Sequence, residues 1–154
     1  MKALVFAMLA GLCWGVGEVF TKAVLHSGKV GPMTAVAVRS IVALPILIAL
    51  AWGAIKITKT EPADWTKAGA GTMTQLLLGS GVIAGAGGVA FFYAALQLGE
   101  VSRVKPIAFA LAPAIGALAG WLALGEAMTA RKVAGLVAIV VGVVLLAGGT
   151  ATKP

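Results

Sequence analysis

Five long apolar segments are the feature that most constrains the fold of this chain. They cover residues 3–25, 32–55, 72–98, 106–124 and 131–149. An α-helix rises 1.5 Å per residue, so about 20 residues cross the roughly 30 Å hydrocarbon core of a bilayer. The chain is 60% hydrophobic and 11% charged, whereas soluble domains average about 45–50% and about 25%. We therefore predict an all-α, polytopic membrane bundle of five transmembrane helices, forming one domain over residues 1–154.

The N-terminal segment has two interpretations. Its basic start, short apolar core and Cys13 resemble a cleaved lipoprotein signal. However, Leu12 stands where lipid attachment needs a small residue, and the apolar run continues well past Cys13. We therefore favour a first transmembrane helix that is retained, with Cys13 as a packing residue.

The basic residues outside the helix interiors predict the topology. Side A, the N-terminal side, carries Lys2, Lys56, Lys59, Lys67, Arg131 and Lys132. Side B carries Lys29, Arg103, Lys105 and Lys153. This bias, with three tryptophans near side A, favours a cytoplasmic N-terminus in the cell inner membrane, although insertion in both orientations stays open. The net charge of +7 lies in loops that would meet anionic lipid, so no nucleic-acid partner is expected.

Ionised residues inside two apolar segments indicate a polar site. Trp14, Glu18 and Lys22 are spaced i, i+4, i+8 and share one face of the first helix. Glu18 precedes the first loop and Arg39 follows it by similar distances, so both lie roughly 10–12 Å inside side B. Tyr93 approaches the same side at the end of the third helix.

These residues admit a structural and a functional interpretation. Each unpaired Glu or Arg deep in a bilayer costs about 2.5–3.5 kcal/mol, so such residues normally face the bundle interior or a wet cavity. Glu18 and Arg39 could form a structural ion pair between the first two helices. Alternatively, Trp14, Glu18, Lys22, Arg39 and Tyr93 line a site for a solute or a proton. A third alternative is that the charged groups reach the membrane surface without a role.

The sequence offers no pattern for catalysis or metal binding. His26 lies in a loop and is the single histidine, so no His/Cys cluster can form. Gly85, Gly87 and Gly88 follow no strand and therefore make no phosphate-binding loop. We predict that the chain is not an enzyme and uses no cofactor or metal.

Small residues recur at helix-packing spacing. Gly11 and Gly15, Gly81 and Gly85, and Gly116 and Gly120 form G-x-x-x-G pairs. Such pairs let helix backbones approach closely. From Val133 onward the last apolar segment has no polar side chain before Thr150, so we expect it to face lipid or a partner subunit.

Several motifs in order resemble an EamA-type domain of the drug/metabolite transporter superfamily. They are the WG at 14–15 with Phe20 and Lys22, the arginine at 39, and the stretch 91–146 with its L-G-E at 124–126. The resemblance implies a multi-pass carrier of small metabolites, usually an exporter. Relatives mostly join two such five-helix domains in opposite orientations. This chain contains one, and whether it is natural in this form or half of a longer protein stays open.

The resemblance therefore implies one half of an inverted-repeat transporter. Two copies inserted oppositely, as an antiparallel homodimer, would place the site at their interface. The related small multidrug resistance proteins carry their proton-coupling glutamate eight residues before the first-helix lysine, where this chain has Trp14. Proton coupling through Glu18 and uncoupled or anion-linked transport thus both remain open. The net positive cluster favours an anionic or zwitterionic solute.

These observations predict a secondary transporter, an exporter of a small metabolite or drug-like solute, that works as a dimer by alternating access. Its partners would be the solute, membrane lipid and a second copy. The alternative is a non-transporting membrane scaffold or one subunit of a hetero-oligomeric flippase.

Overall fold

The computed structural model describes residues 2–148, except for the side chain of Leu146. Contacts between the helices divide the chain into two compact units, Met1–Leu98 and Gly99–Pro154. Within the described range every regular element is a helix, and no strand is present. The predicted all-α class is therefore confirmed. The single-domain organisation remains a prediction, and the two units are considered separately.

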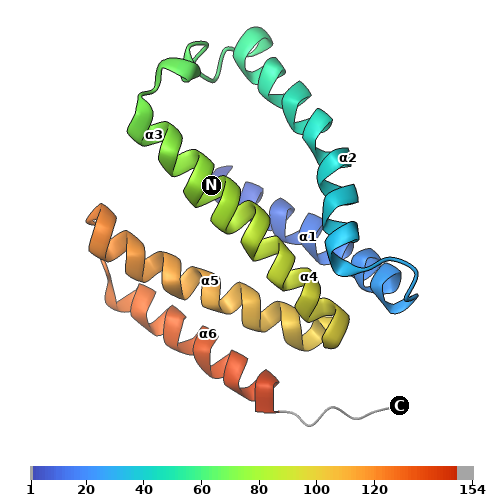
Figure 1. Ribbon diagram of the computed structural model, residues 1–154. Coiled ribbons are helices and arrows are strands. Elements are labelled where there is room, and N and C mark those ends of the chain that lie inside the picture. Colours follow the sequence, from blue (N-terminus) through green and yellow to red (C-terminus); the bar gives the residue numbers. More distant parts are fainter. Residues whose placement is uncertain (1, 149–154) are drawn as a thin grey trace. The chain divides into compact units, whose positions relative to one another are not determined.

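The first unit contains three long helical segments (Figure 1). The first is α1, Lys2–His26. The second is α2, Pro32–Trp52, which continues as the π-helical η1, Gly53–Ile57. The third runs without a break through α3, Ala70–Thr74, η3, Gln75–Gly88, and α4, Val89–Leu98. These ranges agree with the predicted segments 3–25, 32–55 and 72–98, and a short 3₁₀ turn, η2 (Trp65–Lys67), lies in the loop between the last two.

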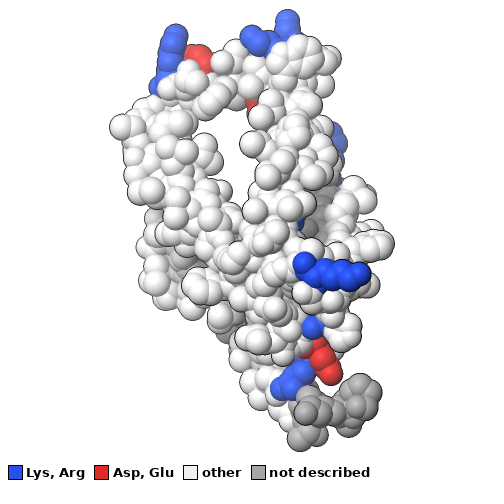
Figure 2. Space-filling model, turned by 45° about the vertical axis from the view of Figure 1, so that its right-hand side comes forward, with Lys and Arg blue, Asp and Glu red and all other residues white. Residues whose placement is uncertain are grey.

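The helices of the first unit meet at α4. This helix contacts both α1 and α2, and α1 also contacts α2. Among the described elements, α2 makes no contact with η3, and the two diverge toward the loop that joins them (Figure 1). Figure 2 shows charged side chains gathered over that loop, with mostly uncharged surface directly below it. The buried apolar residues of this unit, Leu25, Tyr93 and Leu96, lie where α4 meets its neighbours.

The middle of the third segment is a π-helix, which the sequence does not reveal. Fourteen residues, Gln75–Gly88, adopt this geometry, whereas π-helices mostly occur as single turns. In this geometry a β-carbon at Gly81, Gly85, Gly87 or Gly88 would lie close to the carbonyl five positions before it. A β-carbon on Gly85 would lie 3.1 Å from the carbonyl oxygen of Ser80, so glycine gives this turn its room.

The second unit is a helical hairpin. It consists of α5, Val101–Leu124, and α6, Ala130–Gly148, which contact each other and run side by side in Figure 1. The predicted start at residue 106 was wrong, because α5 begins at Val101. Its first turn is closed by the N–H of Val104, which donates to the carbonyl of Glu100 at 2.9 Å. Pro106 therefore lies inside the helix, as membrane helices allow.

Four helical segments are long and apolar enough to cross a membrane. They are Lys2–His26, Pro32–Ile57, Ala70–Leu98 and Val101–Leu124. The multi-pass character of the chain thus follows from length and composition. The fifth predicted span, 131–149, corresponds to α6 up to residue 148, and residue 149 lies outside the described residues. That α6 also crosses the membrane stays a prediction.

Candidate functional site

The first helix turns one polar face toward its neighbours. Glu18 is 8% exposed and Leu25 is 4% exposed, while Thr21 and Lys22 between them are half-buried. Positions i, i+3, i+4 and i+7 lie on one side of a helix, so these four residues form a continuous inward stripe. Burial of Glu18 agrees with the expectation that an ionisable group inside a membrane segment faces protein rather than lipid.

Tyr93 connects the second and third helical segments to this stripe. Its side chain is 4% exposed, and its ring lies 5.7 Å from the guanidinium carbon of Arg39 in a cation–π contact. Nη1 of Arg39 also donates to the Tyr93 hydroxyl at 3.5 Å, a long hydrogen bond. On its other side the same hydroxyl lies 3.3 Å from Oγ1 of Thr21. One phenol hydroxyl therefore bridges α2, α4 and α1.

The donors and acceptors at its two ends fix the direction of this chain of hydrogen bonds. The Thr21 hydroxyl donates its proton to the carbonyl of Gly17 at 3.2 Å. Oγ1 can then only accept from Tyr93, because a hydroxyl carries one proton. Arginine only donates, so the Tyr93 oxygen accepts from Arg39. The resulting order is Arg39 to Tyr93 to Thr21 to the Gly17 carbonyl.

Lys22 reaches the end of α4. Its Nζ donates to the carbonyl oxygen of Leu96 at 2.7 Å. That carbonyl is one of the last four in α4, which have no partner within their own helix. A cation at this position also interacts favourably with the negative end of the helix dipole. Lys22 therefore joins the first and third helical segments at the C-terminal end of α4.

The structure brings together some of the predicted site residues and not others. Arg39 and Tyr93 are in contact, and Lys22 lies one turn along α1 from the buried Glu18. Within the described part of the chain, the contacts of Arg39 are with Tyr93, and an ion pair with Glu18 is not among them. Trp14 continues the stripe with its side chain 51% exposed. Direct pairing of Glu18 with Arg39 was one of the alternatives from the sequence, and in the structure Arg39 contacts Tyr93 instead.

The sequence interpretation missed Thr21. It considered ionisable residues and aromatic rings, and a threonine in an apolar run carries no charge to mark it. Its spacing of three from Glu18 places it on the inward face, and this spacing was the available signal.

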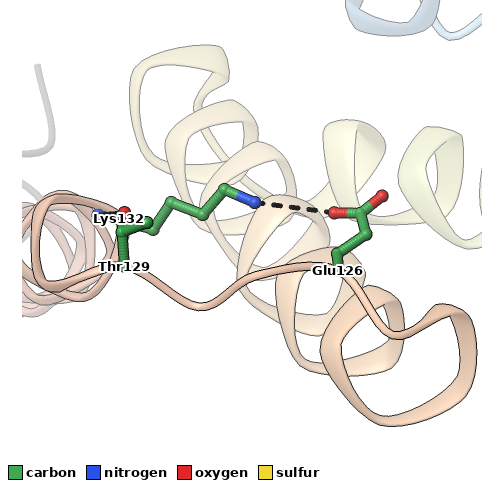
Figure 3. A network of polar contacts seen from close by, with 3 residues as sticks. All are labelled: Glu126, Thr129 and Lys132. Carbon is green, nitrogen blue, oxygen red and sulfur yellow. Dashed lines mark hydrogen bonds and ion pairs between the residues drawn. The ribbon is translucent and has the colours of Figure 1, made fainter.

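The second unit contains a polar network of its own around the L-G-E motif. Gly125 adopts a left-handed φ of 67°, a conformation that glycine adopts without steric cost, and thereby ends α5. The N–H groups of Gly125 and Glu126 both donate to the carbonyl of Gly120. Glu126 then forms an ion pair with Lys132 at 3.6 Å (Figure 3). Thr129 accepts from the N–H of Lys132 at 3.3 Å, as an N-cap does.

The opposite end of the hairpin is fixed by Arg103. Its Nη2 donates to the carbonyl of Ala147 at 2.7 Å, within the last turn of α6. Arg103 thus donates to a carbonyl in the last turn of α6, as Lys22 does in the last turn of α4. In the same unit, Nζ of Lys105 lies 5.4 Å from the ring of Phe109.

Comparison with known proteins identifies the family. The chain matches the EamA-like transporter family over residues 1–148. Comparison with curated proteins gave no match. Comparison with solved structures gave none either. Since the family match covers nearly the whole chain, the protein belongs to the EamA-like transporter family, within the drug/metabolite transporter superfamily.

Proposed function

We propose that the protein is a secondary transporter that exports a small metabolite or drug-like solute. Family membership supports a transport role. The observation that carries the proposal is the polar cluster inside three membrane segments, in which Glu18 is buried and Arg39, Tyr93 and Thr21 are linked by hydrogen bonds. Placing such groups in a bilayer costs several kcal/mol, which partial pairing does not fully offset. A solute site explains why a chain would carry them.

The proposed site consists of Glu18, Arg39, Lys22, Tyr93 and Trp14. Arg39 lies about 10 Å along α2 from its first residue, and Glu18 lies about 12 Å from the end of α1. Both therefore belong to the half of the membrane near side B. In the proposed mechanism, α1 and α2 rock against a second copy and open the site to each side in turn. The second copy is inserted in the opposite orientation, as an antiparallel homodimer in the inner membrane.

Transport by purified protein tests the proposal. The full chain is reconstituted into proteoliposomes, and uptake of labelled amino acids, nucleosides and quaternary organic cations is measured against protein-free vesicles. We expect accumulation of at least one probe, reduced at least about tenfold in Glu18→Gln and Arg39→Ala, because each removes a charged group of the proposed site and hydrogen bonds to charged groups contribute about 1.5–3 kcal/mol. Lys29→Gln, in an exposed loop, is the matched control and should transport normally.

Two results would count against the proposal in different ways. Unchanged uptake in both Glu18→Gln and Arg39→Ala would refute the site. If the folded, reconstituted chain transports none of the probes, the proposal that this chain transports a solute by itself is contradicted. The non-transporting scaffold or flippase subunit is then favoured.

A further inference from the structure

The hydrogen bonds from Arg39 to Tyr93 and from Tyr93 to Thr21 indicate which chemical group Arg39 can bind. A guanidinium carries five N–H donors in a planar fork. Nη1 directs one of them to Tyr93, and the Tyr93 ring contacts the guanidinium at 5.7 Å. Arg39 is nevertheless exposed on the surface of its unit, so the remainder of its fork is available to a ligand. We propose that this fork binds the carboxylate of the transported solute, and that Thr21 and Tyr93 are the residues that position it.

Charge and geometry favour a carboxylate. A planar fork matches the two oxygens of a carboxylate in a bidentate pair, which a lysine cannot reproduce. Lys22 and Glu18 of the proposed site carry opposite formal charges, which leaves the Arg39 guanidinium to neutralise one negative charge, whereas a phosphate monoester carries about −1.5 to −2 at neutral pH. A phosphate would therefore leave uncompensated charge inside the membrane. A cationic solute would be repelled by Arg39.

Thr21 contributes although it does not touch the ligand. Its hydroxyl proton is committed to the Gly17 carbonyl, so its oxygen accepts from Tyr93 and turns the Tyr93 lone pairs toward Arg39. Arginine side chains have high rotamer entropy, and a fork already held in place loses less of it on binding. Loss of the Thr21 hydroxyl should therefore weaken ligand binding through Arg39 rather than unfold the helix.

Binding measurements test this inference without requiring transport. Thermal unfolding of the full chain in detergent is followed with acetate, benzoate and N-acetylglycine, each against its uncharged amide. Phenyl phosphate is an additional arm. We expect at least one carboxylate to raise Tm, since a ligand stabilises the state it binds, and the amides to leave Tm unchanged. Phenyl phosphate should shift Tm less than benzoate.

Variants assign the effect to the proposed residues. Arg39→Gln should weaken carboxylate binding about tenfold or more, as loss of a charged hydrogen bond does. Arg39→Lys, which keeps the charge but lacks the fork, should weaken it as well. Tyr93→Phe and Thr21→Val should each raise the Kd for the carboxylate. Thr21→Ser should have the Kd of the unaltered protein, because the hydroxyl is retained. Lys29→Gln is the control, and circular dichroism verifies that each variant is folded.

The outcomes separate this inference from the proposed function, on which it rests. If no carboxylate stabilises the protein, or if the shift persists in Arg39→Gln, the inference is overturned even where another solute is transported. A stronger shift with phenyl phosphate overturns the choice of carboxylate. Normal binding in Thr21→Val and Tyr93→Phe overturns the positioning role. Carboxylate binding through Arg39 without any transport leaves the carboxylate site at Arg39 standing and refutes the proposed function.

Discussion

The carboxylate of Glu126 packs against the backbone of Gly120, so that a β-carbon at position 120 would lie 3.1 Å from its Cδ. Gly120 is buried, and its carbonyl also accepts the two N–H groups that close the end of α5. The second glycine of this G-x-x-x-G pair, Gly120, thus leaves space for the turn that joins α5 to α6. A β-carbon on Gly116, by contrast, would meet no atom within 4 Å.

This contrast gives the first prediction. Glycine to alanine inside a helix gains roughly 0.5–1 kcal/mol, and Gly116→Ala should show this gain as a higher Tm in detergent. Gly120→Ala should not show this increase in Tm, because the Glu126 side chain has to move away and its ion pair with Lys132 is disturbed. In a Glu126→Ala background the alanine at 120 should become stabilising. Equal Tm values for Gly116→Ala and Gly120→Ala would contradict this account.

The π-helix gives the second prediction. Gly85→Ala places a methyl group against the Ser80 carbonyl, a backbone group that cannot rotate aside as a side chain can. Overpacking of this kind costs about 1–3 kcal/mol, and Tm falls by about 2–4 °C per kcal/mol in chains of this size. Gly79→Ala, in the same helix with no atom within 4 Å of its β-carbon, is the control. A Gly85→Ala protein as stable as Gly79→Ala would mean that the glycine is not required there.

The third prediction concerns Lys22. Lys22→Gln removes the charged donor to the Leu96 carbonyl, and a hydrogen bond to a charged group contributes about 1.5–3 kcal/mol. We expect Tm to fall by several degrees. Lys29→Gln should leave Tm unchanged, because it is the backbone N–H of Lys29 that contacts Ser27. If Lys22→Gln and Lys29→Gln have the same Tm, Lys22 has no role in joining α1 to α4.

The fourth prediction concerns the end of α6. Arg103→Gln removes the donor to the Ala147 carbonyl and the positive charge at the helix C-terminus. Hydrogen exchange in the last turn of α6 should become faster, while the first turn keeps its protection. Arg131→Gln, at the exposed start of α6, provides the comparison. Exchange in the last turn that stays as slow as in the unaltered protein would show that Arg103 does not stabilise this end.

Most residues of the candidate site could be named from the sequence, but the contacts between them could not be predicted. The helical period placed Glu18 and Lys22 on one face, and loop distances placed Arg39 at a similar depth. Neither quantity fixes how α2 is rotated against α1. Glu18 was therefore one candidate partner of Arg39, whereas the residue that Arg39 contacts is Tyr93 from α4. Thr21 was missed because its role depends on the position of that tyrosine.

The sequence by itself determined that the chain is helical, that it is built from membrane-length segments, and that it belongs to a transporter family. Apolar length and helical period are local properties, and the bilayer accepts only helices or closed barrels. Tertiary structure alone decided which helices meet at Tyr93, where glycine makes room for a π-turn, and that Lys22 and Arg103 stabilise helix ends. These features arise from groups distant along the chain, and their meeting depends on helix rotation and packing that no local pattern encodes.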